Sequence, residues 1–217
     1  MVRVLFIMLA VCCASFGTAQ AEAAKPLFKL ATDYSQLKTI PGCYPDAPNA
    51  LYYRCYDARE AYDNALARAK SENKPLMIVW GFDECSACRY FESQEFNPSK
   101  PWMTDRFAQW TLSETHKQAL GNGGLDLEIL LLRLNIRAES GLALAAELGV
   151  RDLALSRGGH RVWSPFITMT HPQTEQFVSQ ASMRAGEQPC NRWDEYALNL
   201  EALGLIPVDE SFLRRIC

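Results

Sequence analysis

The sequence predicts an α/β fold in which helices cover the faces of a central sheet. Two apolar segments, residues 75–82 (PLMIVWGF) and 127–136 (LEILLLRLNI), are continuous rather than alternating, as is typical of strands buried on both faces. For residues 127–136 a helix remains an alternative. Helical patterns surround these segments in the order helix, strand, helix, strand, helix, strand, strand, helix, which indicates a layered α/β domain.

The first helix is predicted to begin after Asp57. Asp57 and Glu60 have the spacing of a capping box, in which two side chains bind free N–H groups at a helix start. The pattern ends near Asn73, and Pro75 prevents its continuation. One face of this helix carries apolar side chains at helical spacing, namely Ala58, Ala61, Tyr62, Ala65, Leu66 and Ala69.

Three more helices are expected in the middle of the chain. One opens at Cys85 in CSACRYFESQEF, and a short one lies around residues 102–110. The third spans residues 139–148, where apolar residues recur at helical spacing before Gly149, a residue that commonly ends helices.

A strand, a hairpin partner and a final helix are predicted towards the C-terminus. Residues 162–170 (VWSPFITMT) form the strand, although Pro165 cannot donate to a β-ladder and should lie at an edge or a bend. Residues 175–183 can return as its hairpin partner. The final helix has an apolar stripe closed by Gly204 and Pro207, and the stripe consists of Trp193, Tyr196, Ala197, Leu200 and Leu203.

The first 21 residues predict a secretory signal peptide. Arg3 is followed by a short apolar run and by the small-x-small sequence that ends at Ala21, so we expect export and cleavage after Ala21. A membrane anchor is the alternative, but the run is too short to span a bilayer comfortably. The whole chain of 217 residues is 48% apolar with a net charge of -3, which fits a globular domain without a basic surface for nucleic acid.

Six cysteines follow the predicted cleavage point, and an even number in an exported chain favours disulfides. Besides Cys85 and Cys88, four cysteines allow three pairings. We prefer structural disulfides Cys43–Cys55 and Cys190–Cys217, because each joins the nearest partners in sequence. The alternatives are a redox relay from Cys43 and Cys55, and a free thiol at Cys217.

Cys85 and Cys88 form a Cys-x-x-Cys motif where a strand turns into a helix. The thiolate attacks disulfides, and the free N–H groups and partial positive charge of a helix start stabilise it at Cys85. Cys88, one turn later and facing the sheet, can then resolve a mixed disulfide. The alternatives are a purely structural disulfide and a metal site, but zinc needs about four ligands and no second Cys-x-x-Cys is present.

The segment KPLMIVWGFDECSACRYFES, followed by WSPFITMT, resembles the thioredoxin superfamily. Within it, the pattern is most similar to periplasmic domains such as the reductant-carrying C-terminal domain of DsbD. The resemblance covers residues 57–205 and implies a thioredoxin fold, a central mixed sheet flanked by helices, with an N-terminal extension. It also implies that Cys85 is the nucleophile, that Cys88 resolves, and that Pro165 is a cis-proline. The Ser164 backbone would then bind a substrate strand.

The sequence departs from thioredoxins beside the motif. Thioredoxins usually carry Trp before the nucleophile and a buried Asp six residues before it, whereas this chain has Glu84 and Val79. Glu84 or Asp83 could replace the missing acid in proton transfer. The alternative is that both acids belong to a solvated loop that caps the helix. Two acids beside Cys85 oppose its thiolate.

These patterns divide the chain into a signal peptide (1–21), an irregular N-terminal extension (22–56), a thioredoxin-like domain (57–205) and a C-terminal tail (206–217). We expect a periplasmic or secreted thiol–disulfide oxidoreductase, closer to a reductase or isomerase than to an oxidase. It should exchange disulfides with protein partners and an external electron-carrying protein, without a bound cofactor or metal. The alternatives are a non-catalytic binding or chaperone module, and a copper(I) carrier using the same cysteines.

Overall fold

The computed structural model describes residues 28–44, 46–47, 49–95, 128–150, 152, 165–179 and 198–206, with the backbone alone at positions 90, 91 and 93–95. Several predicted features lie outside these residues, so they stay predictions. They are the signal peptide at 1–21, the short helix at 102–110, the first part of the final helix, Ser164, Cys190 and Cys217.

A five-stranded mixed sheet forms the centre of the fold, in the order β1-β3-β2-β4-β5. The pairs β1–β3 and β2–β3 are parallel, whereas β2–β4 and β4–β5 are antiparallel. The α/β class and the central mixed sheet are therefore confirmed. The strands are β1 (Phe28–Leu30), β2 (Leu76–Gly81), β3 (Ile129–Asn135), β4 (Phe166–Thr170) and β5 (Phe177–Val178).

The two continuous apolar segments form β2 and β3, which are adjacent in the sheet. Every residue of β2 is buried, as expected for a strand covered on both faces. Residues 129–135 are a strand, which excludes the helical alternative. Strand β1, at the edge of the sheet, was not predicted, because three residues that include a lysine are too short to show a pattern.

Helix α1 (Ala58–Glu72) has the predicted start and the predicted buried face. The Asp57 carboxylate accepts hydrogen bonds from the backbone N–H groups of Arg59 and Glu60. The capping box is only half formed, because the Glu60 carboxylate binds the N–H of Lys38 instead, at 3.3 Å. Asn73 ends the helix in a left-handed conformation, with φ of 52°.

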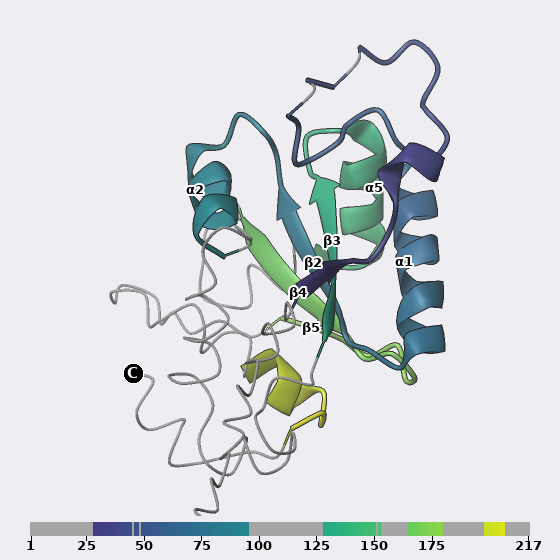
Figure 1. Ribbon diagram of the computed structural model, residues 1–217, viewed down its shortest axis with the longest axis vertical. Coiled ribbons are helices and arrows are strands. Elements are labelled where there is room, and N and C mark those ends of the chain that lie inside the picture. Colours follow the sequence, from purple (N-terminus) through teal and green to yellow (C-terminus); the bar gives the residue numbers. More distant parts are fainter. Residues whose placement is uncertain are drawn as a thin grey trace, which may run out of the picture.

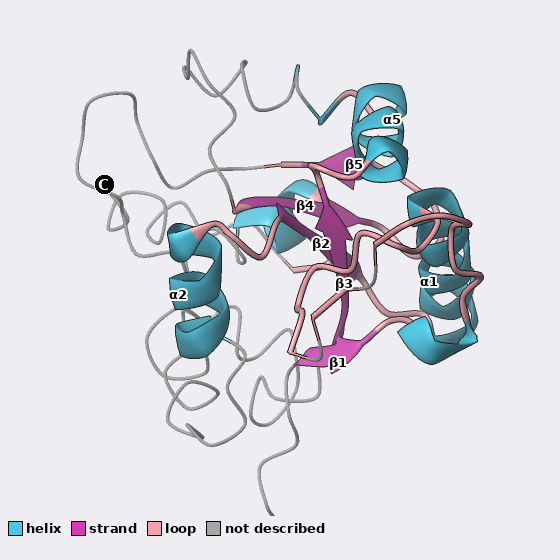
Figure 2. Ribbon diagram, turned by 90° about the horizontal axis from the view of Figure 1, so that it is seen from above, coloured by secondary structure: helices cyan, strands magenta, loops and turns pink. Residues whose placement is uncertain are grey.

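Helices cover both faces of the sheet (Figures 1 and 2). Helix α1 and helix α5 (Glu139–Glu147) pack on one face, and helix α2 (Ser86–Glu95) lies on the other. Residues 198–202 are helical and add Leu200 to the α2 side, where Leu203 and Ile206 are also buried. The last turn of the final predicted helix is therefore helical in the structure and buries its apolar side.

Alternate side chains of β2 supply the two cores. Leu76, Ile78 and Trp80 join the cluster on the side of α1 and α5. Met77 and Val79 join the cluster that contains Cys88 and Leu200. Because neighbouring strand residues point to opposite faces, β2 connects both cores through its own backbone.

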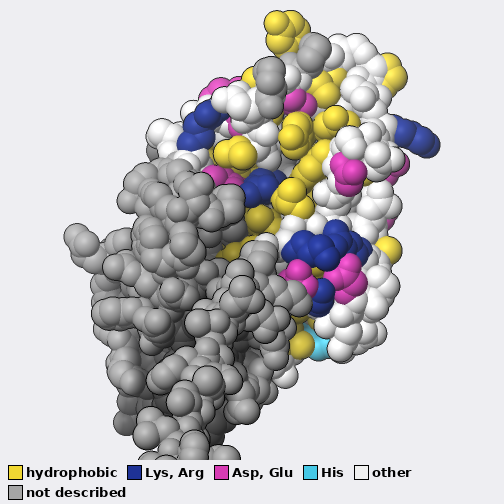
Figure 3. Space-filling view, in the orientation of Figure 1, with side chains coloured by type: hydrophobic (Ala, Val, Ile, Leu, Met, Phe, Trp, Pro, Cys, Tyr) yellow, Lys and Arg dark blue, Asp and Glu magenta, His cyan; other side chains and the backbone are white. Residues whose placement is uncertain are grey.

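Acidic and basic side chains lie side by side on one surface of the described residues (Figure 3). Arg68 pairs with Glu72, and Lys74 pairs with Glu72 and Glu128. Arg68 and Glu72 stay partly exposed, and ion pairs near the surface each stabilise a fold by less than about 1 kcal/mol. Glu128, the second partner of Lys74, is buried. In the described part of the chain, no helix has the length and apolarity to cross a bilayer.

We expect Gly141→Ala to destabilise the protein by at least about 2 kcal/mol, because overpacking has a cost of this order. A Cβ atom at position 141 would overlap the Asn135 carbonyl group, so helix α5 could not keep its contact with the end of β3. Urea unfolding measures the difference. Leu142→Ala, on the exposed side of the same helix, is the control and should change stability by about 0.5 kcal/mol or less. A tolerated Gly141→Ala would contradict this packing.

Candidate functional site

The two cysteines of the motif lie where β2 leads into α2. Strand β2 ends at Gly81, three residues separate it from Cys85, and α2 begins at Ser86. The Cys85 N–H donates to the Phe82 carbonyl at 3.2 Å, and the Arg89 N–H donates to the Cys85 carbonyl at 3.0 Å. A tight turn therefore places Cys85 immediately before the first helical residue.

Cys85 and Cys88 are joined by a disulfide, with Cα atoms 5.2 Å apart. Cys85 is half-buried, whereas Cys88 has no exposed surface. The backbone N–H of Cys88 donates to the Cys85 sulfur at 3.0 Å. Cys85 thus keeps part of its surface exposed and its sulfur receives a hydrogen bond from the helix start, whereas Cys88 is shielded by the core.

Pro165 lies at the same end of the sheet as the motif. It occupies a bend immediately before β4, and the next residue, Phe166, pairs with Trp80 near the end of β2. This agrees with the expectation that the proline sits at a bend rather than inside a ladder. Its neighbour Ser164 lies outside the described residues, so the predicted substrate contact and the cis bond between them stay predictions.

The two acids before Cys85 have different surroundings. The Asp83 carboxylate accepts hydrogen bonds from the backbone N–H groups of Leu51, at 2.9 Å, and Tyr52, at 3.2 Å. Its side chain is only 18% exposed. Glu84 is exposed. Asp83 is therefore engaged in holding another segment of the chain, which favours a structural role for its carboxylate over proton transfer.

A buried ionic group that the sequence analysis missed lies behind the motif. Both Glu92 carboxylate oxygens accept a hydrogen bond from Arg133 Nε at 2.9 Å. Glu92 Oε2 also lies 2.8 Å from Arg133 Nη2. The Tyr52 hydroxyl donates to Glu92 at 2.9 Å. Glu92 lies four residues after Cys88 and so shares its helix face, which is the one signal that the sequence offered.

The groups around Glu92 keep their protons. Burial, and then the charge and hydrogen bond of Glu92, raise the pKa of Tyr52, so its hydroxyl remains a donor. Burial works against the charge of Arg133, but the hydrogen bonds and charge of Glu92 outweigh it and raise the pKa of this guanidinium. Arg133 lies opposite Val79 in the register of β2 and β3. A largely shielded cation, with 13% of its side chain exposed, therefore lies on the strand beside the position where thioredoxins carry an acid.

The turn between β2 and Cys85 carries the aromatic ring of Phe82. The Arg137 guanidinium lies 3.7 Å from the centroid of the Phe82 ring, a cation–π contact between the loop after β3 and the turn after β2. The side chain of Asn135, at the end of β3, donates to the Tyr52 carbonyl at 2.8 Å. The ends of β2 and β3 are thus joined by side chains as well as by the ladder.

Cys43 and Cys55 are joined by a disulfide, with Cα atoms 5.5 Å apart. This is the first of the two pairings that we prefer from the sequence. Cys55 is buried and Cys43 is half-buried. The second preferred pair, Cys190 and Cys217, lies outside the described residues. Within the described ranges, no group of three or more His, Cys, Asp or Glu side chains is arranged to hold a metal ion.

Comparison with known proteins agrees with this geometry. A sequence profile described as thioredoxin-like matches residues 57–125, which include α1, β2 and the Cys-x-x-Cys motif. The fold is thioredoxin-like. No curated protein matches the sequence significantly.

Two solved structures resemble the chain at low sequence identity. A disulphide isomerase from Xylella fastidiosa Temecula1 is 18% identical, with 60% of this chain and 78% of that chain covered and a TM-score of 0.40. A thioredoxin from Thermus thermophilus is 14% identical, with 66% and 82% covered and a TM-score of 0.34.

We expect Arg133→Met to destabilise the protein by about 3 kcal/mol at pH 8, because it leaves the Glu92 carboxylate buried without its cation. The loss should be smaller at pH 5. A buried acid without a partner binds its proton more tightly in the folded than in the unfolded state, so the variant loses stability as pH rises.

Unfolding by urea at both pH values measures this effect. The double variant with Glu92→Leu removes the unpaired charge and should recover part of the stability at pH 8. Equal losses at the two pH values, with no recovery in the double variant, would contradict the assignment of a buried ion pair.

Proposed function

We propose that this protein is a thiol–disulfide oxidoreductase that exchanges disulfides with protein partners through Cys85 and Cys88. The observation that carries the proposal is the unequal placement of two bonded sulfurs at a helix start. Cys85 is partly exposed and its sulfur receives the Cys88 N–H, whereas Cys88 is fully buried. Disulfide exchange needs one such reachable thiolate and one shielded neighbour.

The reaction proceeds in two exchange steps when the pair is reduced. The Cys85 thiolate attacks one sulfur of a partner disulfide, which forms a mixed disulfide and releases the other partner sulfur as a thiolate. The Cys88 thiolate then attacks the Cys85 sulfur, which releases the second partner thiol and leaves Cys85 bonded to Cys88. An external dithiol protein returns two electrons and two protons, so no bound cofactor is needed.

We also propose that the protein works after export, as a periplasmic reductase or isomerase similar to the C-terminal domain of DsbD. The leader pattern at residues 1–21 supports export. The Cys43–Cys55 disulfide supports an oxidising compartment. The acids Asp83 and Glu84 beside Cys85 do not favour an unusually stable thiolate, and strong oxidants depend on a stabilised reduced form.

Reduction of insulin by dithiothreitol tests the proposed activity. We expect the wild type to accelerate insulin precipitation and Cys85→Ser to reduce the rate to that of dithiothreitol alone, because the attacking sulfur is lost. Ser86→Ala, which alters the exposed neighbouring residue, should leave the rate near that of the wild type. Equal rates with wild type and Cys85→Ser would instead favour a structural disulfide in a binding module.

Expression of the full chain in a bacterium tests the proposed export. We expect the periplasmic fraction to contain a protein whose first residue is Glu22, because the small-x-small pattern ends at Ala21. Intact mass and N-terminal sequencing measure the cut. Replacement of Ala19 by a bulky residue should block cleavage at this point. An uncut chain in the cytoplasmic fraction would contradict export.

A further inference from the structure

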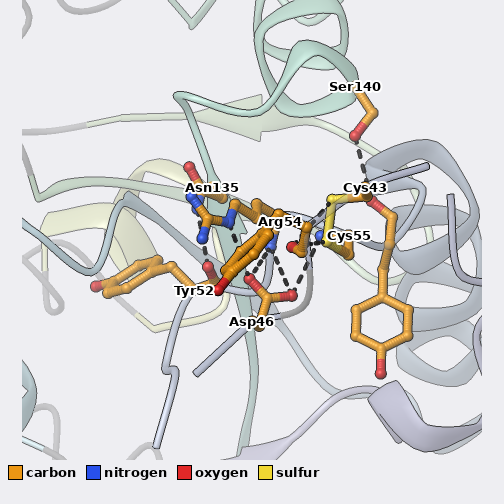
Figure 4. Close-up of a disulfide and its surroundings, with 9 residues drawn as sticks. Cys43, Asp46, Tyr52, Arg54, Cys55, Asn135 and Ser140 are labelled. Atoms are coloured by element: carbon orange, nitrogen blue, oxygen red, sulfur yellow. Dashed lines mark hydrogen bonds and ion pairs between the residues drawn. A yellow bond between two sulfur atoms is a disulfide. The ribbon is translucent and has the colours of Figure 1, made fainter. Parts of the chain in front are cut away.

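A disulfide between Cys43 and Cys55 closes a loop in the N-terminal segment (Figure 4). The loop, residues 43–55, has Cys43 and Cys55 bonded at its base. The Asp46 carboxylate binds across the loop, accepting the backbone N–H groups of Arg54 at 3.0 Å and Cys55 at 3.2 Å. The Ile40 N–H donates to the Cys55 carbonyl at 2.7 Å. The base of this disulfide loop is therefore fixed by one covalent bond and several hydrogen bonds.

The disulfide loop also contacts the segment that leads to Cys85, through Leu51 and Tyr52. The N–H groups of Leu51 and Tyr52 both donate to the Asp83 carboxylate. The Tyr52 ring lies against Gly81, where a Cβ atom would come within 2.6 Å of the ring carbons. Glycine at position 81 thus allows the close approach of the loop, and Asp83 binds it.

Asp83 is also fixed from the side of helix α2. Arg89 Nε donates to the Asp83 backbone carbonyl at 2.7 Å, and its guanidinium lies 3.9 Å from the Asp83 carboxylate. The N–H of the same arginine donates to the Cys85 carbonyl. The residue two positions before Cys85 is therefore held by the disulfide loop on one side and by the first turn of the helix on the other.

The two backbone N–H groups have an electrostatic consequence for Cys85. A free carboxylate two residues away would oppose the thiolate. Two backbone amides donate charge-assisted hydrogen bonds to the Asp83 carboxylate and so disperse its negative charge. If the disulfide loop were released, Asp83 would lose both donors while keeping its charge close to the reactive sulfur.

We infer that Asp83 is a positioning residue for Cys85, and that the Cys43–Cys55 disulfide keeps it in that role by holding the Leu51 and Tyr52 amides against its carboxylate. This inference rests on the proposed function, since it concerns the same nucleophile. It gives the N-terminal disulfide a role in reactivity that requires no exchange of electrons with the motif.

Alkylation of Cys85 by iodoacetamide tests this coupling in the full chain. Cys88→Ser leaves Cys85 as the only thiol of the motif, and peptide mass spectrometry follows its modification separately from that of other cysteines. The rate at pH 7 is compared between chains with the intact loop disulfide and chains carrying Cys43→Ser with Cys55→Ser. We expect the opened loop to slow alkylation about threefold, because the Asp83 carboxylate without its two donors opposes the Cys85 thiolate more strongly, an effect partly offset by the higher nucleophilicity of a more basic thiolate.

Two charge-removing variants in the intact loop give an independent test. Glu84→Gln removes an exposed charge beside Cys85 and should accelerate alkylation, since it removes repulsion of the thiolate. Asp83→Asn removes the same amount of charge but offers an N–H₂ group to one of the two loop amides. We expect it to accelerate alkylation less than Glu84→Gln does, because the two loop amides already disperse the charge of Asp83 in the intact loop.

The outcomes separate this inference from the proposed function. If Asp83→Asn accelerates alkylation as much as Glu84→Gln does, the loop amides do not disperse the charge of Asp83 and the inference is wrong. Unchanged alkylation in the opened loop would also overturn it. If the double serine variant does not fold, the comparison of Asp83→Asn with Glu84→Gln decides. Alkylation needs no partner protein, so an inactive wild type in the insulin assay would refute the proposed function without affecting this result.

Discussion

The position of Cys85 depends on strand β2, which is hydrogen-bonded to β3 on one side and to β4 on the other. A strand held on both sides and buried on both faces cannot shift its register without disrupting both cores. Its last residue, Gly81, therefore starts the turn to Cys85 from a fixed point. The reactive turn is anchored to a strand that is buried on both faces and paired on both sides, as a site that must hold a defined geometry requires.

Helix geometry turns this fixed point into two unequal sulfurs. The first, Cys85, lies just before the helix, where N–H groups have no partner within the helix. The second, Cys88, lies within the first turn on the side that packs against Met77 and Val79. One turn further along the same helix face, Glu92 forms an ion pair with Arg133. The polar group behind the motif thus comes from the helix and from β3, and not from β2.

The N-terminal segment is part of the fold rather than an attachment to it. Residues 28–30 extend the sheet at the β3 edge. The Tyr34 hydroxyl donates to the Arg133 carbonyl at 2.7 Å and accepts from the Arg133 N–H at 3.0 Å. Tyr52 reaches Glu92, Asn135 and Gly81. The predicted description of residues 22–56 as an irregular lead-in did not include these contacts.

The sequence by itself determined the α/β class, helix α1 with its buried face, strand β2 and the helix start at Cys85, and it left strand β3 open to a helical alternative. These features depend on local periodicity, capping and turn residues, which are physical properties of neighbouring positions. Only the tertiary structure decided that Asp83 binds the Leu51 and Tyr52 amides, that Glu92 pairs with Arg133, and that residues 28–30 join the sheet. Each of these contacts joins segments far apart in the chain, and their partners are chosen by packing geometry that no local pattern contains.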